Sequence, residues 1–262
     1  MRNVVYVSLI AGLVGLAGLA SYPDLAYAQG NQWGTSVKGQ VVFAGANVPK
    51  APELQVTKDQ AHCLSKGPIL SEEWVINAPD KGIKNVFVWI TKPDGTKPPI
   101  HADLAQIKEK NVNLDQPVCA FVPHSQGMRE GQTLVVNNSA PVAHNVNWTG
   151  SRAKNPGSNV IVPSGGKHLV SNLKADNTPI TVKCDIHTWM RGWIRVFDHP
   201  YFAVTDADGK FEIKQPPAGK YQIWYWHDTG FKDGAAGNKG FPIEIKAGAD
   251  TDLGKVDWKP AG

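Results

Sequence analysis

The sequence predicts an all-β protein built from sandwich-like parts. Short runs rich in valine, isoleucine and aromatic residues alternate apolar with polar positions, which is typical of half-buried strands. Clusters of glycine, proline, asparagine and aspartate separate these runs at short, even intervals, as in sandwiches and barrels. Only residues 101–110 have the composition of a short helix.

Each expected strand is an apolar run bounded by turn residues. Residues 37–43 form the first strand, and a less regular stretch follows over 51–79. Residues 84–90 form the second strand, which ends at a proline-rich connection. The later strands are expected at 118–122, 131–138, 143–148, 159–162, 168–171, 179–183, 192–197, 201–204, 211–213, 221–226, 241–246 and 253–258.

The first 28 residues are expected to be a secretory signal peptide. Arg2 gives a positive start, residues 4–20 are apolar, and Ala26-Tyr27-Ala28 is a small-x-small cleavage site. The alternative is a membrane anchor, but glycines interrupt the apolar run and polar residues follow it. We expect a mature chain without a membrane span, in the periplasm or secreted.

The charge distribution shows no basic stripe of the kind that binds nucleic acid. The formal net charge is +4, and the lysines are scattered rather than gathered in a stripe. We therefore expect no nucleic-acid partner.

Four side chains have the chemistry of a metal site. Cys184, His187 and Met190 fall on one short loop between two expected strands, and His144 lies about forty residues upstream. One thiolate, two imidazoles and one thioether suit copper and few other metals. Zinc also binds Cys and His, but it does not call for a methionine.

These residues resemble the cupredoxin family. The run at 131–138, then His144-Asn145, then Cys184-x-x-His187-x-x-Met190 is similar to its pattern, with a short ligand loop of the amicyanin type. The resemblance covers residues 112–199. It implies a Greek-key sandwich with one type 1 copper that cycles between Cu(I) and Cu(II). It also implies that His187 lies near the surface as the electron port, where redox proteins dock, and that His144 is more buried.

Neighbouring residues are expected to support the site. Asn145 would tie the two ligand-bearing loops together by hydrogen bonds, although it could also be a turn asparagine. Trp189 is expected at an apolar docking rim and Trp193 in the core. The remaining histidines are interpreted as structural or solvated: His62, His101, His124, His168, His199 and His227.

The outer segments resemble the carboxypeptidase regulatory-like family. The resemblance rests on residues 37–43, 84–90, 206–211 and 216–221. It implies a small transthyretin-like sandwich. We expect residues 34–91 and 201–262 to form it as a discontinuous domain, with the copper-binding segment 112–199 inserted in a loop. The alternative is two sequential domains, in which the first strands extend the copper domain.

Three cysteines are an odd number for an exported protein. If Cys184 is a metal thiolate, Cys63 and Cys119 can pair in an oxidising compartment. The alternative is that both are small buried side chains. A disulfide would join the outer sandwich to the copper domain.

The sequence thus favours an exported blue-copper protein that carries single electrons and is not an enzyme. One alternative is a cell-envelope binding or adhesion module with structural copper or none. Another is a copper-handling protein that delivers the metal.

Overall fold

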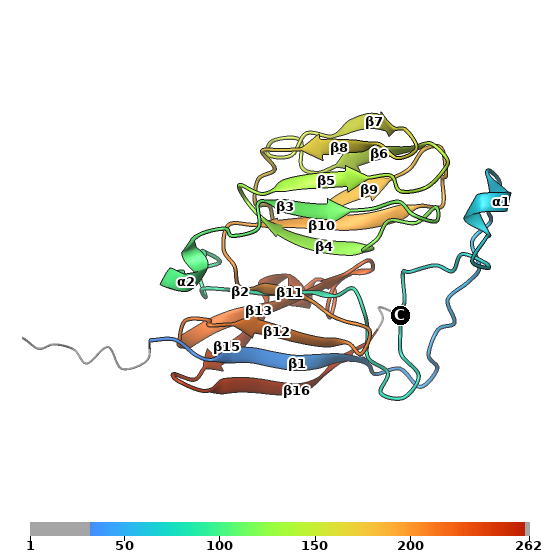
Figure 1. Ribbon diagram of the computed structural model, residues 1–262. Helices are drawn as coiled ribbons and strands as arrows, with labels where there is room; N and C mark the ends of the chain where they lie inside the picture. Colours follow the sequence, from blue (N-terminus) through green and yellow to red (C-terminus); the bar gives the residue numbers. More distant parts are fainter. Residues whose placement is uncertain (1–31, 260–262) are drawn as a thin grey trace, which may run out of the picture. The chain divides into compact units, whose positions relative to one another are not determined.

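The computed structural model describes residues 32–259, which lie in the compact unit Asn31–Gly262. Most of its regular structure is β-strand, arranged in four sheets (Figure 1), so the all-β class is confirmed. No helix in residues 32–259 is long and apolar enough to cross a membrane. The signal peptide expected at 1–28 lies outside the described residues.

Two sheets built from residues 111–197 form what we call the site-bearing sandwich (Figure 1). One has the strand order β4-β10-β9-β6-β7 and the other β3-β5-β8. Their bounds are β3 Asn111–Leu114, β4 Ser125–Arg129, β5 Thr133–Asn137, β6 His144–Thr149, β7 Ser158–Val162, β8 Lys167–Val170, β9 Ile180–Lys183 and β10 Arg191–Phe197.

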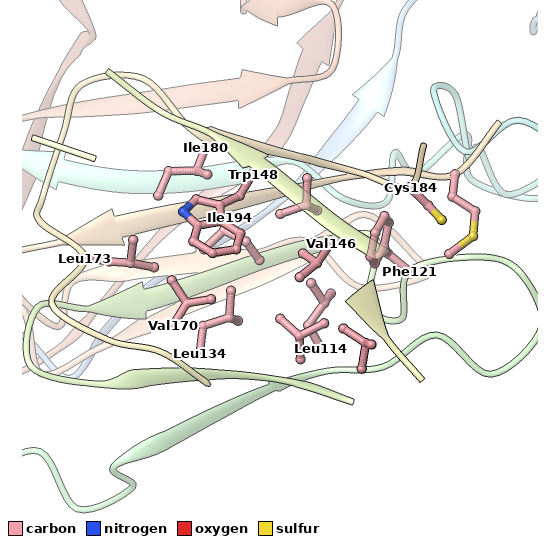
Figure 2. Close-up of a cluster of buried hydrophobic side chains, with 14 of the residues drawn as sticks. Leu114, Phe121, Leu134, Val146, Trp148, Val170, Leu173, Ile180, Cys184 and Ile194 are labelled. Carbon is pink, nitrogen blue, oxygen red and sulfur yellow. The ribbon is translucent and has the colours of Figure 1, made fainter. Parts of the chain in front are cut away.

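A continuous apolar core fills the space between these two sheets. In β9, Ile180 and Val182 point inward while Lys183 is exposed, as strand alternation requires. Each buried side chain of this size stabilises the fold by about 1.5–3 kcal/mol. Figure 2 shows Cys184 at one end of the cluster and Leu173 at the other. The cysteine therefore occupies the edge of a rigid core.

Two further sheets form what we call the flanking sandwich. They have the orders β12-β1-β16 and β11-β2-β13-β14, with β15 also paired to β13. Their elements are β1 Ser36–Phe43, β2 Phe87–Thr91, β11 Phe202–Val204, β12 Lys210–Lys214, β13 Gly219–His227, β14 Gly230–Phe231, the 3-10 helix η1 Ala236–Lys239, β15 Phe241–Ile245 and β16 Asp250–Trp258. The strands come from both ends of the described chain. The division into a discontinuous and an inserted domain, and the transthyretin-like family, remain our hypotheses.

Two expected elements differ from the structure. The helix expected at 101–110 is only α2, Ala102–Ala105. The Leu104 carbonyl, which a longer helix would bond to residue 108, instead accepts a hydrogen bond from Arg129 Nη1 at 2.7 Å. The strand expected at 118–122 is wrong, because Cys119 has φ 54° in a reversal closed by a bridge between Asp115 and Val122.

Aromatic side chains from both sandwiches pack into one cluster. Trp193 and Phe197 of β10 meet Phe87 and Trp89 of β2 and Trp226 of β13. The Trp193 and Trp226 rings are 4.9 Å apart, edge to face. This cluster joins β10, which follows directly on the ligand loop, to the flanking sandwich.

A buried histidine adds a polar link beside this cluster. His124 Nε2 lies 3.0 Å from Asp228 Oδ2, and its Nδ1 lies 3.5 Å from Glu72 Oε2. Burial disfavours the charged imidazole, but the hydrogen bond to Asp228 and the negative charges of Asp228 and Glu72 outweigh it and raise the pKa of His124 to about 9. The sequence pattern offered no sign of these partners.

The raised pKa of His124 predicts a pH-dependent stability. A folded-state pKa above the unfolded value of 6.5 stabilises the protein fully below pH 6.5, and this contribution is lost as the pH rises through about 9. We expect the free energy of unfolding to fall by on the order of 2–3 kcal/mol across this window. Urea unfolding at each pH measures it. In His124→Gln the unfolding free energy should change less with pH, whereas His168→Gln should behave as wild type. An unchanged pH dependence in His124→Gln would contradict the assignment to His124.

Candidate metal centre

The four candidate ligands come from two neighbouring strands and the turn that follows one of them. His144 is the first residue of β6, and β6 pairs antiparallel with β9. Cys184 follows β9 directly, and His187 and Met190 lie in the turn before β10. Because the strands are antiparallel, the end of β9 lies beside the start of β6. The strand pairing thus brings Cys184 next to His144.

The donor atoms of His144, Cys184 and His187 all lie within 4.8 Å of one another. Cys184 Sγ is 3.8 Å from His144 Nδ1 and 3.7 Å from His187 Nδ1. All three side chains are buried. Both imidazoles therefore direct the same ring nitrogen at one sulfur.

These separations fit a trigonal metal site. Metal–nitrogen bonds of about 2.0 Å and metal–sulfur bonds of about 2.3 Å, at 120°, span about 3.7 Å between nitrogen and sulfur. A thiolate with two imidazoles is a donor set that copper prefers. His144, Cys184 and His187 are the residues that would hold it.

Met190 closes the ligand loop. Its backbone N–H donates to the His187 carbonyl at 2.9 Å, and its carbonyl accepts from the Cys184 N–H at 3.3 Å. The side chain is buried in the same core cluster as Cys184. Backbone hydrogen bonds thus fix Met190 in the ligand loop, and its thioether would complete the donor set of a bound copper.

Asn145 connects the two ligand-bearing segments. Its Oδ1 accepts hydrogen bonds from the backbone N–H groups of Asp185 (2.7 Å) and Ile186 (3.0 Å), and from the Cys184 thiol (3.2 Å). His187 N–H also donates to Cys184 Sγ at 3.4 Å. These bonds hold the sulfur in place from both sides.

Asp185 extends this network. Its carboxylate accepts hydrogen bonds from the side-chain amides of Asn145, Asn147 and Asn159 at distances of 2.6 to 3.2 Å. Asn145 and Asn147 lie two positions apart on β6, and so share one face of the strand. The Asn-x-Asn spacing was a signal that could have indicated this role.

The structure corrects the expected position of His187. Its exposed fraction is 0%, so it does not lie at the surface. Its Nε2 is 2.9 Å from Asp59 Oδ2. We call residues 53–70, which include Asp59, the cover segment. They lie in the irregular stretch between β1 and β2, from which nothing in the sequence pattern pointed to the site.

The cover segment is closed at its base and fastened at its tip. At the base, Leu54 N–H donates to the Ile69 carbonyl at 2.8 Å. Within α1 (Gln60–Cys63), His62 Nε2 lies 3.1 Å from the Pro117 carbonyl. A disulfide joins Cys63 to Cys119, and both sulfurs lie within 4.8 Å of a His187 ring nitrogen. The segment is therefore packed directly against the metal-ligand candidate.

Trp189 contacts both the 115–122 reversal and His187. Its indole N–H donates to the Cys119 carbonyl at 3.1 Å, and its ring meets His187 edge to face at 5.3 Å. It is only partly exposed, because the cover segment and the 115–122 reversal lie around it. Trp193 is buried in the aromatic cluster between the sandwiches.

Burial keeps both imidazoles in the form that binds metals. It lowers the pKa of His144 to about 4, with a further contribution from His187. Burial also lowers the pKa of His187, against the opposing effect of the hydrogen bond that Asp59 accepts from it. Neutral imidazole is the ligand form, so both rings are ready to bind at neutral pH.

Comparison with known proteins gives matches to solved structures. No family model matches the chain, and no curated protein matches it. The M51A mutant of amicyanin in its Cu(I) form is 16% identical, over 42% of this chain and 98% of that one, with a TM-score of 0.31. A purple cupredoxin from Nitrosopumilus maritimus is 15% identical, over 33% and 99%, with a TM-score of 0.28.

A Cu-containing nitrite reductase from Thermus scotoductus SA-01 is 16% identical, over 38% of this chain and 25% of that one, with a TM-score of 0.31. All three likenesses cover less than half of this chain. The function proposed below therefore depends on the geometry of this chain's own site.

The Asp59 contact predicts a measurable effect on metal affinity. A carboxylate that accepts from the outer N–H of a ligating histidine raises the basicity of that ligand, and losing such a partner typically costs 10–100-fold in affinity. We expect Asp59→Asn to weaken Cu(II) binding by about tenfold or more, measured by competition with a chelator. Asp94→Asn, on an exposed turn, is the control. Equal affinities in Asp59→Asn and wild type would contradict this role for Asp59.

Proposed function

We propose that this protein is an exported blue-copper electron carrier. The observation that carries the proposal is the arrangement of Cys184 Sγ with two imidazole Nδ1 atoms at 3.7 and 3.8 Å, all buried. This is a trigonal thiolate–imidazole set with a methionine fixed beside it. Such sites carry electrons in proteins. No bond-making step is proposed.

Copper held here would supply a single-electron Cu(I)/Cu(II) couple. The chain's own contribution is to hold the ligands in fixed positions and to exclude water from them. Asn145 fixes the backbone of the ligand loop at Asp185 and Ile186, and the Asp185 carboxylate fixes Asn145. Because the ligands are held by hydrogen bonds and by the apolar core, little needs to move when the charge of the site changes. A preformed site of this kind favours rapid electron exchange.

The path between the site and a partner protein would run across the cover segment. His187 contacts Asp59, whose side chain is 34% exposed, so one hydrogen bond separates a buried ligand from a group that reaches solvent. We propose that redox proteins dock near His187 on this segment rather than on the imidazole itself.

The cellular setting is part of the same proposal. A signal peptide at 1–28 would export the chain to the periplasm or beyond, where the Cys63–Cys119 disulfide is stable. The copper-binding segment 112–199 would be carried as an insertion in the flanking sandwich, whose family we propose to be transthyretin-like.

The visible spectrum tests the proposal. The copper-loaded protein is expected to show an intense thiolate-to-copper band at about 600 nm, because a trigonal Cys-His-His site gives strong sulfur-to-copper charge transfer. Cys184→Ser should abolish this band.

The matched control is the double variant Cys63→Ala/Cys119→Ala, which removes the other two cysteine sulfurs. It should keep the band, because neither sulfur is a proposed ligand. A wild-type protein that binds copper without colour would contradict the proposal, and would favour a binding module or a copper-handling protein.

A further inference from the structure

A buried arginine lies where the two sandwiches meet, away from the metal-ligand candidates. Arg195 is on β10 and is 4% exposed. Its guanidinium carbon stacks over the Trp89 ring at 3.8 Å, and lies 5.1 Å from the Phe197 ring centroid. Its Nη1 donates to the Asn177 carbonyl at 2.6 Å. One edge of the guanidinium is therefore satisfied.

The other edge is not satisfied by the protein. In residues 32–259, Nε has no hydrogen-bond partner, and no carboxylate forms an ion pair with Arg195. Asp176 acts on Arg195 from a distance, but its carboxylate accepts hydrogen bonds from the Ser151 hydroxyl and the Asn177 N–H. Burying a charge without a counter-ion is costly. This cost lowers the pKa of Arg195 to about 9, because burial disfavours the charged guanidinium.

A cavity of about 330 Å³ lies beside this unsatisfied arginine. Trp89, Trp224 and Phe231 form its apolar wall, with ring centroids 5.7 to 6.2 Å apart. Thr91, Thr178 and Asn238 line it with polar groups. The cavity therefore combines one cation, a flat aromatic wall and neutral hydrogen-bonding groups.

A second donor converges on the same space. Thr91 Oγ1 accepts the Trp224 indole N–H at 2.9 Å. Because this lone pair is used, the hydroxyl proton of Thr91 is free to point to another acceptor. Among residues 32–259, Arg195 is the only charged side chain that lines this cavity. An adjoining cavity that shares Arg195 is also lined by two lysines and two aspartates, whose charges balance: Lys97, Lys154, Asp176 and Asp198. A single negative charge would complete the site.

We propose that this cavity binds a small aromatic carboxylate, with one oxygen on Nη2 of Arg195, the other on the Thr91 hydroxyl, and its ring against Trp224 and Phe231. A carboxylate offers one oxygen to each of these two donors, and its negative charge would pair with the guanidinium. The aromatic wall favours a flat ring over a compact inorganic anion. This binding activity is independent of the metal site.

Isothermal titration calorimetry with benzoate as the probe tests the proposal, using the full-length mature protein. Benzoate is expected to bind more tightly than acetate or sulfate, because only benzoate also contacts the aromatic wall. Benzylamine, with the same ring and the opposite charge, should not bind. Absence of benzoate binding, or equal binding of benzoate and sulfate, would overturn the proposal.

Single substitutions test whether benzoate binds in the cavity beside Arg195. Arg195→Gln is expected to weaken benzoate binding by at least about tenfold, since hydrogen bonds to a charged group contribute about 1.5–3 kcal/mol. Arg152→Gln, an exposed arginine, is the charge-matched control and should bind as wild type. Thr91→Val keeps the side-chain shape and should weaken binding several-fold, so it serves if Arg195→Gln does not fold. Wild-type affinity in Thr91→Val, or in a folded Arg195→Gln, would place the ligand elsewhere.

Discussion

The hydrogen bonds from the backbone of Asp185 and Ile186 to Asn145 Oδ1 hold together two chain segments that are forty residues apart. Together with the pairing of β6 and β9, this contact sets the thiol-bearing loop against the strand that carries His144. The apolar core supports it from one side and the Asp185 carboxylate from the other. Ligands held by the fold in this way would need little rearrangement if a bound metal exchanged electrons.

The cover segment separates the candidate ligand His187 from solvent. It leaves the flanking sandwich, reaches the metal centre, and places Asp59 on the outer nitrogen of His187. The Cys63–Cys119 disulfide fastens it there, and cross-linking a chain in this way chiefly restricts its unfolded states. The flanking sandwich therefore supplies part of the metal centre's environment. It also supplies the aromatic wall of the cavity at Arg195, so both sites draw on residues from two distant parts of the sequence.

Local patterns in the sequence predicted the all-β class and the metal-ligand candidates, because both depend on short-range features. Strand alternation is visible over five residues, and Cys184, His187 and Met190 fit in one turn. The disulfide between Cys63 and Cys119, expected if Cys184 is a metal thiolate, is confirmed. The burial of His187 could not be predicted, because Asp59 lies 128 positions away in an irregular stretch. The partners of His124 and the unpaired charge of Arg195 likewise arise only where the sandwiches meet.

X-ray absorption at the copper edge tests the central claim most directly, because it counts the ligands of the bound metal. The account predicts one sulfur at about 2.2 Å and two imidazole nitrogens at about 2.0 Å in the loaded protein. It also predicts that the short sulfur contribution persists when Cys63 and Cys119 are replaced together. A first shell of only nitrogen and oxygen would contradict it, because copper would then be bound away from Cys184.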